Sequence, residues 1–204
     1  DGNSVSPVST PYAPRLYGVS VDGSGNAWTS GQRGSVMRFT GSSWETINQA
    51  PDLIDVWTTA ANNAWAVGEF GAVYRWNGSS WTRQSTPTTA ALNTVWAASS
   101  SDAFAGGDNG TMLRWNGSSW SSMAFPGSGN VYALWGTAAN NVYATTSAGQ
   151  VLRFNGSSWS VVTTAAQALW AVHGSSANDV FATGENGTAL RFNGTSWSPV
   201  SAPT

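Results

Sequence analysis

The sequence predicts an all-β fold built from five similar units of four short strands, and two regularities in its 204 residues support this. The pentapeptide Asn-Gly-Ser-Ser-Trp or a near copy of it occurs five times, with its tryptophans 37, 39, 39 and 38 residues apart. An arginine precedes each tryptophan by six residues. The pairs are Arg38 and Trp44, Arg75 and Trp81, Arg114 and Trp120, Arg153 and Trp159, and Arg191 and Trp197. Repeats of this length with several strands each indicate a five-bladed β-propeller of four-stranded antiparallel blades.

The second repeat shows the four strands of a unit most clearly. Its segments LIDVWTTA, AWAVGEF, AVYRWNG and WTRQSTP are rich in Val, Trp, Tyr and Thr and are separated by Asn and Gly. Helical periodicity is absent, and Gly or Pro interrupts the chain about every ten residues. We therefore expect a single domain over 1–204, with blades at about 12–51, 52–90, 91–128, 129–166 and 167–204.

Residues 1–11 form a sixth copy of the fourth strand, because DGNSVSPVSTP aligns without gaps with NGTSWSPVSAP at 193–203. Val5 stands where the other copies have Trp. One interpretation is a closing strand that covers an edge of the last blade. The other is a remnant of the preceding blade of a longer array, natural or engineered.

Composition excludes several classes of function. Eight Arg, no Lys and ten acidic residues give a net charge of -2, which argues against a nucleic-acid partner. The chain lacks Cys and any apolar run long enough to span a membrane as a helix. Because it begins at Asp1 without a leader, we expect a processed protein that is secreted or on the cell surface.

The last repeat, with NDVFATGENGTALRFNGTSW, resembles the degenerate Asp-box (BNR-like) propeller repeats of photosystem II stability-factor-like proteins. The Gly and Trp of the Asp-box are present, for example as Gly194 and Trp197, whereas Phe192 stands where the box has Asp. The five-bladed organisation is similar to that of tachylectin-type lectins. These resemblances imply a propeller fold, but they are compatible with sugar binding and with assembly roles alike.

The repeated NGSSW is expected to be a turn between the third and fourth strands. Asn-Gly favours a type I′ hairpin turn, and the tryptophan would anchor the outer strand. The pattern also matches an N-glycosylation acceptor, but its regular recurrence at a turn makes coincidence the better explanation. The repeated arginines are expected to be structural, bonded to the same backbone carbonyls in each blade, with ligand contact as the alternative.

An enzyme is not expected, because the strands that would line the channel carry a single carboxylate. The aligned positions are Gly18, Asp55, Thr94, Ala133 and Ala171. Asp55 alone cannot supply an acid and a nucleophile, and the single His173 has no partners for a triad or a zinc site. No catalytic residue, metal or cofactor is therefore predicted.

Two groups of residues are candidates for ligand binding. Trp57, Trp96, Trp135 and His173 occupy one aligned position, where they form either core packing or a row of aromatic platforms near the inner rim. Asp108, Asn109, Glu185 and Asn186 are polar groups in the variable turns between the second and third strands. A Trp-rich surface of low charge predicts a non-catalytic, lectin-like propeller that binds glycans at repeated sites between blades. The alternatives are a protein-interaction or assembly scaffold with a protein partner, or an array of blades without a ligand.

Overall fold

Five antiparallel sheets of four strands make up the protein, each built from one sequence repeat. The computed structural model describes residues 15–39, 41, 43–48 and 51–200. The prediction of an all-β, five-bladed propeller is confirmed. The extra outer-strand copy at residues 1–11 lies outside the described residues. Within the described ranges, no helix has the length and apolar character needed to cross a membrane.

In each blade the strands follow the chain from the inner edge, next to the centre of the arc, to the outer edge. The first blade contains β1 (Leu16–Val21), β2 (Ala27–Gly31), β3 (Ser35–Phe39) and β4 (Trp44–Asn48). The second contains β5 (Leu53–Ala60), β6 (Asn63–Gly68), β7 (Val73–Trp76) and β8 (Trp81–Gln84). The third contains β9 (Leu92–Ser99), β10 (Asp102–Gly107), β11 (Met112–Trp115) and β12 (Trp120–Ser122). The fourth contains β13 (Val131–Ala138), β14 (Asn141–Thr146), β15 (Gln150–Phe154) and β16 (Trp159–Thr164). The fifth contains β17 (Leu169–Ser176), β18 (Asp179–Gly184), β19 (Ala189–Phe192) and β20 (Trp197–Pro199).

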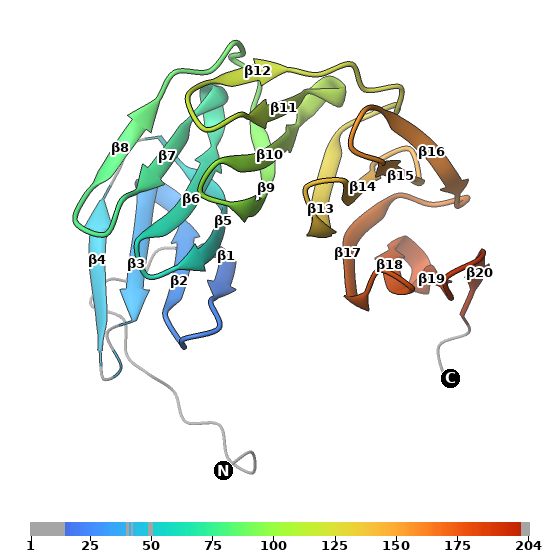
Figure 1. The fold of residues 1–204 in the computed structure, drawn as a ribbon, viewed down its shortest axis with the longest axis horizontal. Helices are drawn as coiled ribbons and strands as arrows, with labels where there is room; N and C mark the ends of the chain where they lie inside the picture. The colour runs from blue at the N-terminus through green and yellow to red at the C-terminus, as the bar shows by residue number, and fades with distance from the viewer. Residues whose placement is uncertain (1–14, 40, 42, 49–50, 201–204) are drawn as a thin grey trace.

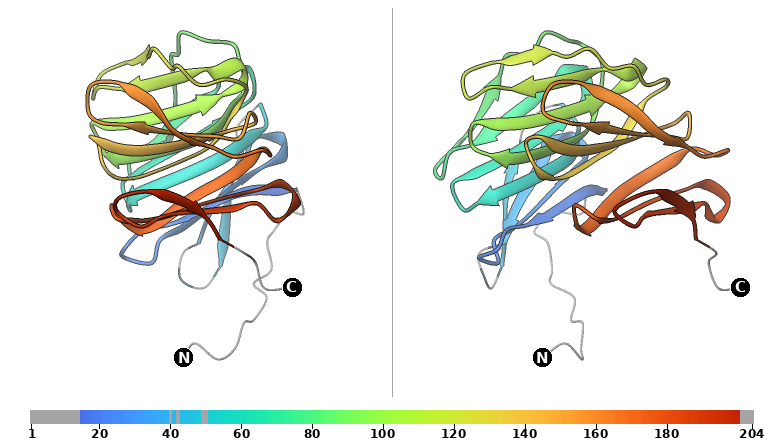
Figure 2. Two further views of the ribbon diagram at one scale, coloured as in Figure 1. Left: turned by 90° about the vertical axis from the view of Figure 1, so that its right-hand side faces the viewer. Right: turned by 45° about the vertical axis from the view of Figure 1, so that its right-hand side comes forward.

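The blades stand in an arc around a common centre (Figure 1). The first strands of neighbouring blades pack side by side, in the order β1, β5, β9, β13 and β17. The first and fifth blades form the two ends of the arc in Figure 1, and Figure 2 shows the same blades from two further directions. Among the residues that the structure describes, each interior blade is therefore covered on both faces, whereas each end blade has a neighbour on one face.

Aromatic rings join each blade to the next. The ring in the middle of a second strand packs against the pair formed by the third-strand aromatic residue and the fourth-strand tryptophan of the following blade. Trp65 lies 5.2 Å from both Trp115 and Trp120, measured between ring centroids. The equivalent contacts join Trp28 to Trp76 and Trp81, Phe104 to Phe154 and Trp159, and Tyr143 to Phe192 and Trp197. Burial of such rings stabilises the contact between neighbouring blades.

The repeated arginines cover these aromatic contacts at the outer part of the blades. The Arg114 guanidinium lies 5.3 Å from the ring of Phe104 and 5.5 Å from that of Phe154 in the next blade. The arginines have the predicted structural role. The prediction that they bond to backbone carbonyls, however, is wrong in most blades. Arg114 pairs with Asp102, Arg153 donates to Asn141 Oδ1, and Arg191 pairs with Asp179. Arg75 does have a backbone partner within the described residues, because it donates to the Ser100 carbonyl.

The NGSSW segments are turns between third and fourth strands, but the predicted type I′ geometry is wrong. Only the glycine has a positive φ, which is 102° at Gly78. The Asn77 side-chain oxygen accepts hydrogen bonds from the backbone N–H groups of Ser79 and Ser80, so the side chain organises a four-residue loop. A type I′ turn occurs instead between β10 and β11, where Asn109 and Gly110 have φ of 55° and 69°.

Candidate functional site at the centre of the blades

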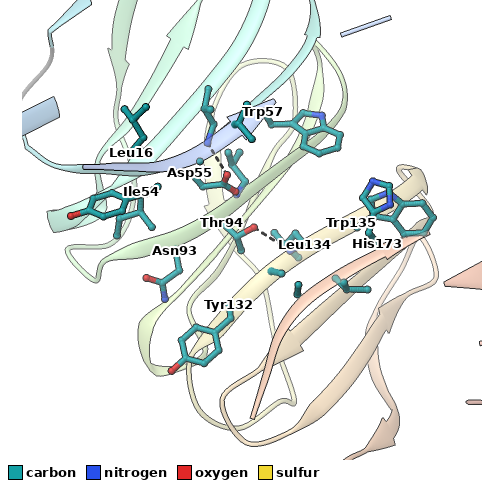
Figure 3. Close-up of a pocket in the computed structure, with 18 of the residues that line it drawn as sticks. Leu16, Ile54, Asp55, Trp57, Asn93, Thr94, Tyr132, Leu134, Trp135 and His173 are labelled. Carbon is teal, nitrogen blue, oxygen red and sulfur yellow. Dashed lines mark hydrogen bonds between the residues drawn. The ribbon is translucent and has the colours of Figure 1, made fainter. Parts of the chain in front are cut away.

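A cavity of about 810 Å³ lies at the centre of the arc and is lined by residues of all five first strands. Figure 3 shows that its labelled side chains separate into two groups. Trp57, Trp135 and His173 lie at one end, close to the hairpins that join first and second strands. Ile54, Asn93 and Tyr132 lie at the other end, where the first strands begin.

Asp55, the carboxylate of the aligned channel position, joins two blades. Its side chain accepts hydrogen bonds from the backbone N–H of Val95 in the next blade, at 2.9 Å, and from that of Val56, at 2.8 Å. Desolvation raises the pKa of Asp55 to about 6, although these hydrogen bonds act in the opposite direction. At the same position of the next blade, Thr94 Oγ1 accepts a hydrogen bond from Leu134 N–H. The aligned channel position therefore links neighbouring first strands where a polar side chain is present.

The predicted aromatic row packs between blades at the hairpin end. Trp96 and Trp135 are buried, Trp57 is half-buried and His173 is exposed. Trp57 Nε1 donates to the Ala97 carbonyl at 3.1 Å, and the rings of Trp135 and His173 lie 5.5 Å apart. Trp57, Trp135 and His173 line the cavity, whereas Trp96 is not among its lining residues. The rings of Trp96 and Trp135 are covered by protein, so these two offer little area for a ligand to stack on.

The predicted polar turn residues lie at the opposite end, where second strands end and third strands begin. Asp108 accepts a hydrogen bond from the Asn93 side chain at 3.0 Å, and Asn109 N–H donates to the Asn130 side chain of the next blade. Glu185 and Asn186 are exposed in the equivalent turn of the last blade. The two predicted groups therefore lie at opposite ends of the blades and do not form one site, and the four polar turn residues are not among those that line the central cavity.

Sequence reasoning missed a second row of side chains, which we call the aromatic mouth: Tyr17, Ile54, Asn93, Tyr132 and Trp170. Each is the second residue of a first strand, so the row recurs at the repeat spacing. Tyr132 and Trp170 stack with centroids 4.5 Å apart and planes 21° apart, and Trp170 and Tyr17 are about half exposed. The signal in the sequence is that these five residues share one aligned position of the repeat, as Trp57, Trp96, Trp135 and His173 do.

Acidic groups surround the aromatic mouth. Asp52 and Glu69 line the cavity on this side, and Asp108 is bonded to Asn93. The Asp52 carboxylate accepts a hydrogen bond from Arg33 N–H of the preceding blade. In the part of the chain that the structure describes, no three His, Cys, Asp or Glu residues are grouped as a metal site requires. The mouth thus combines open aromatic surface with negative charge, which suits an apolar side chain next to a basic one.

Comparison with known proteins gives the fold and leaves the family open. No protein-family model and no curated protein sequence matches the chain. Solved structures do match. One described as YCF48 bound to D1 peptide has a TM-score of 0.70 and 16% identity over 95% of this chain and 69% of its own. YCF48 from Cyanidioschyzon merolae gives 0.68 and 18%, over 92% of this chain and 72% of its own. The WD40 repeats of RRP9 give 0.82 and 11%, over 95% of this chain and 64% of their own. These matches support a propeller; the resemblance to Asp-box repeats and tachylectins is not confirmed by them.

Proposed function

We propose that this protein is an interaction propeller that binds an extended peptide segment of a partner protein across the aromatic mouth. The observation that carries the proposal is the aromatic mouth, in which Tyr17, Ile54, Asn93 and Tyr132 line the central cavity and Trp170 stacks on Tyr132 beside it. Exposed aromatic residues beside a hollow are typical of protein-binding sites, because they bury a large area with little loss of side-chain entropy.

The charge of the mouth indicates the kind of segment. Asp52 and Glu69 lie next to apolar side chains on the cavity wall. A segment that places an aliphatic or aromatic residue against Tyr132 and a Lys or Arg near these carboxylates would satisfy both features. The similar fold of YCF48, whose structure holds the D1 peptide, supports a peptide as the ligand class.

Sugar binding is the rival proposal, and the packing of the aromatic residues makes it the weaker one. A sugar stacks on an open ring face, whereas Trp96 and Trp135 are buried and Tyr132 and Trp170 cover each other. The outer face of Trp170 is left as a platform. A protein partner fits a row of side chains across several blades better than a small sugar does.

A peptide-library selection on the full chain tests the proposal. We expect selected sequences to share an apolar residue next to a basic one, and Trp170→Ala to weaken their binding at least about tenfold, as loss of an interface anchor does. Val162→Ala is the matched control, because Val162 is an exposed apolar residue on the outer strand β16. It should leave binding unchanged.

The same variants on a glycan array separate the two ligand classes. Glycan binding that depends on Trp170, together with failure to select any peptide, would replace the peptide proposal with sugar binding. If the Trp170→Ala and Val162→Ala variants bind a selected peptide equally strongly, the aromatic mouth is not the binding site.

A further inference from the structure

A second cavity, of about 610 Å³, lies between the fourth and fifth blades. The fourth blade contributes Tyr143 and Arg153 to its wall, and the fifth contributes Phe192, Trp197 and the turn at 194–196. It shares no lining residue with the central cavity. Its volume is within the range of about 300–1,000 Å³ that is usual for small-molecule sites. The cavity is therefore large enough to hold a ligand of its own.

The contact between these two blades is more open than the contact between the third and fourth blades. The rings of Phe104 and Phe154 lie 5.3 Å apart, whereas those of Tyr143 and Phe192 lie 6.4 Å apart. Phe154 is fully buried, but Phe192 at the same position of the next blade is only half-buried. The wider contact leaves apolar ring surface on the wall of the cavity.

The guanidinium of Arg153 is less enclosed than its equivalent in the third blade. Arg114 lies over a ring of each of two blades, at 5.3 Å and 5.5 Å, whereas Arg153 is exposed and lies over Tyr143 alone, at 5.8 Å. Nε of Arg153 donates to Asn141 Oδ1 at 2.7 Å. Its terminal NH2 groups make no hydrogen bond to another described residue, so they remain available to a ligand.

The positive charge of Arg153 has no carboxylate partner in the part of the chain that the structure describes. Asn141 begins β14 at the position where Asp102 and Asp179 begin β10 and β18. Those two aspartates pair with the arginines of their own blades, whereas Asn141 is neutral. Among the described residues that line the cavity, Arg153 is the single charged one. The cavity therefore favours a ligand with one negative charge.

The hydroxyl of Tyr143 is a second polar group without a partner. Tyr143 is 1% exposed, and its hydroxyl makes no hydrogen bond within the described residues. Phe104 holds the same position of β10, so packing between blades does not require the hydroxyl. Burial raises the pKa of Tyr143, so the hydroxyl keeps its proton at neutral pH and can donate it to an acceptor. A buried hydroxyl without an acceptor is destabilising, and an anion bound at Arg153 would supply one.

We propose that the cavity between the fourth and fifth blades binds a small aromatic carboxylate. Its carboxylate group accepts hydrogen bonds from the Arg153 guanidinium and the Tyr143 hydroxyl, and its ring packs against Phe192 and Trp197. A planar carboxylate matches the fork of a guanidinium, whereas a phosphate would bring a second negative charge that the wall does not balance. The site is separate from the aromatic mouth and does not depend on peptide binding there.

Calorimetric titration of the full chain with three probes tests the proposal. Phenylacetate carries both the ring and the carboxylate, acetate lacks the ring, and 2-phenylethanol lacks the charge. We expect phenylacetate to bind at least about tenfold more tightly than the other two, and Arg153→Gln to weaken it at least about tenfold. Arg191→Gln is the matched control, because it removes the same charge at the same repeat position away from the cavity. It should leave phenylacetate binding unchanged.

Tyr143→Phe separates binding from packing. It should weaken phenylacetate binding by about threefold or more without lowering the melting temperature, because the hydroxyl has no protein partner to lose. Addition of phenylacetate should shift the indole N–H resonance of Trp197, which lines the cavity, and not that of Trp120 at the same position of the third blade.

Three results would overturn the proposal. One is the absence of saturable phenylacetate binding, and another is binding that Arg153→Gln and Arg191→Gln weaken equally or not at all. The third is a Tyr143→Phe variant that binds phenylacetate as well as the original chain but melts at a lower temperature, since the hydroxyl would then serve the protein rather than a ligand.

Discussion

Phe104 in the third blade and Phe181 in the fifth occupy the same place in the repeat, yet Phe104 is fully buried and Phe181 is 38% exposed. The strands around them are the same, and the difference lies in the neighbour that follows. Phe104 packs against Phe154 and Trp159 of the next blade. A blade therefore sets the direction of each side chain, whereas the burial of that side chain depends on the adjoining blade.

The largest effect is expected where the second-strand ring is covered. Trp65→Ala should lower the free energy of unfolding by about 4 kcal/mol, because it removes a buried ring and leaves a cavity. Phe181→Ala in the same chain should cost roughly 1 kcal/mol. Urea unfolding measures both, and equal losses would mean that the end blade is covered in solution.

Contacts within a blade should not distinguish interior from end blades. A Cβ at Gly107 would lie 2.1 Å from the Ala91 carbonyl oxygen, and one at Gly184 would lie 1.9 Å from that of Ala168. Because both clashes are with backbone of the same blade, each substitution to Ala should cost about 3 kcal/mol. Gly23→Ala is the control, since nothing lies within 4 Å of that position. Thermal unfolding measures the loss of stability in each variant. We expect Gly184→Ala in the end blade to be as destabilising as Gly107→Ala in the interior blade.

Asp55 makes one interior contact dependent on pH. Its pKa is raised to about 6 in the folded protein, above the usual value of 3.8, so folding is favoured most when the carboxyl is protonated. Its contribution is present below pH 4 and is lost as the pH rises through 6. After allowance for partial exposure, this amounts to about 2 kcal/mol.

Urea unfolding of the protein and of Asp55→Asn at several pH values checks this. The difference in stability between them should change between pH 4 and pH 7 and be constant above pH 7. A difference that is the same at every pH would show that the carboxyl titrates normally.

The smallest effect concerns the arginines. Arg114 is held by two hydrogen bonds to Asp102 and lies between two rings, so Arg114→Gln should cost about 1 kcal/mol. Arg191 is itself exposed, lies over the single ring of Phe181 and pairs with Asp179, so Arg191→Gln should leave the melting temperature unchanged. If both substitutions reduced stability equally, the second ring beside Arg114, that of Phe154, would contribute nothing to stability.

The repeat spacing was enough to predict the blades, because one residue pattern written five times fixes the strand order and the turns. It could not predict the type of the NGSSW turn, since the Asn77 side chain, rather than a pair of positive φ angles, organises that loop. Nor could it separate the two ends of the cavity. The Trp57 position and the Tyr132 position both carry aromatic residues, and only the packing shows that the first faces a neighbouring blade while the second reaches solvent.

Hydrogen–deuterium exchange of the full chain, with and without a library-selected peptide, tests most directly the claim that the aromatic mouth binds a peptide. Bound peptide should slow exchange at the beginnings of β5, β9, β13 and β17 and in the Asp108–Gly110 turn. Exchange at the hairpin end, around Thr59 and Asn63, should be unchanged. Protection confined to the hairpin end would contradict the proposal and place the ligand beside Trp57 and Trp135 instead.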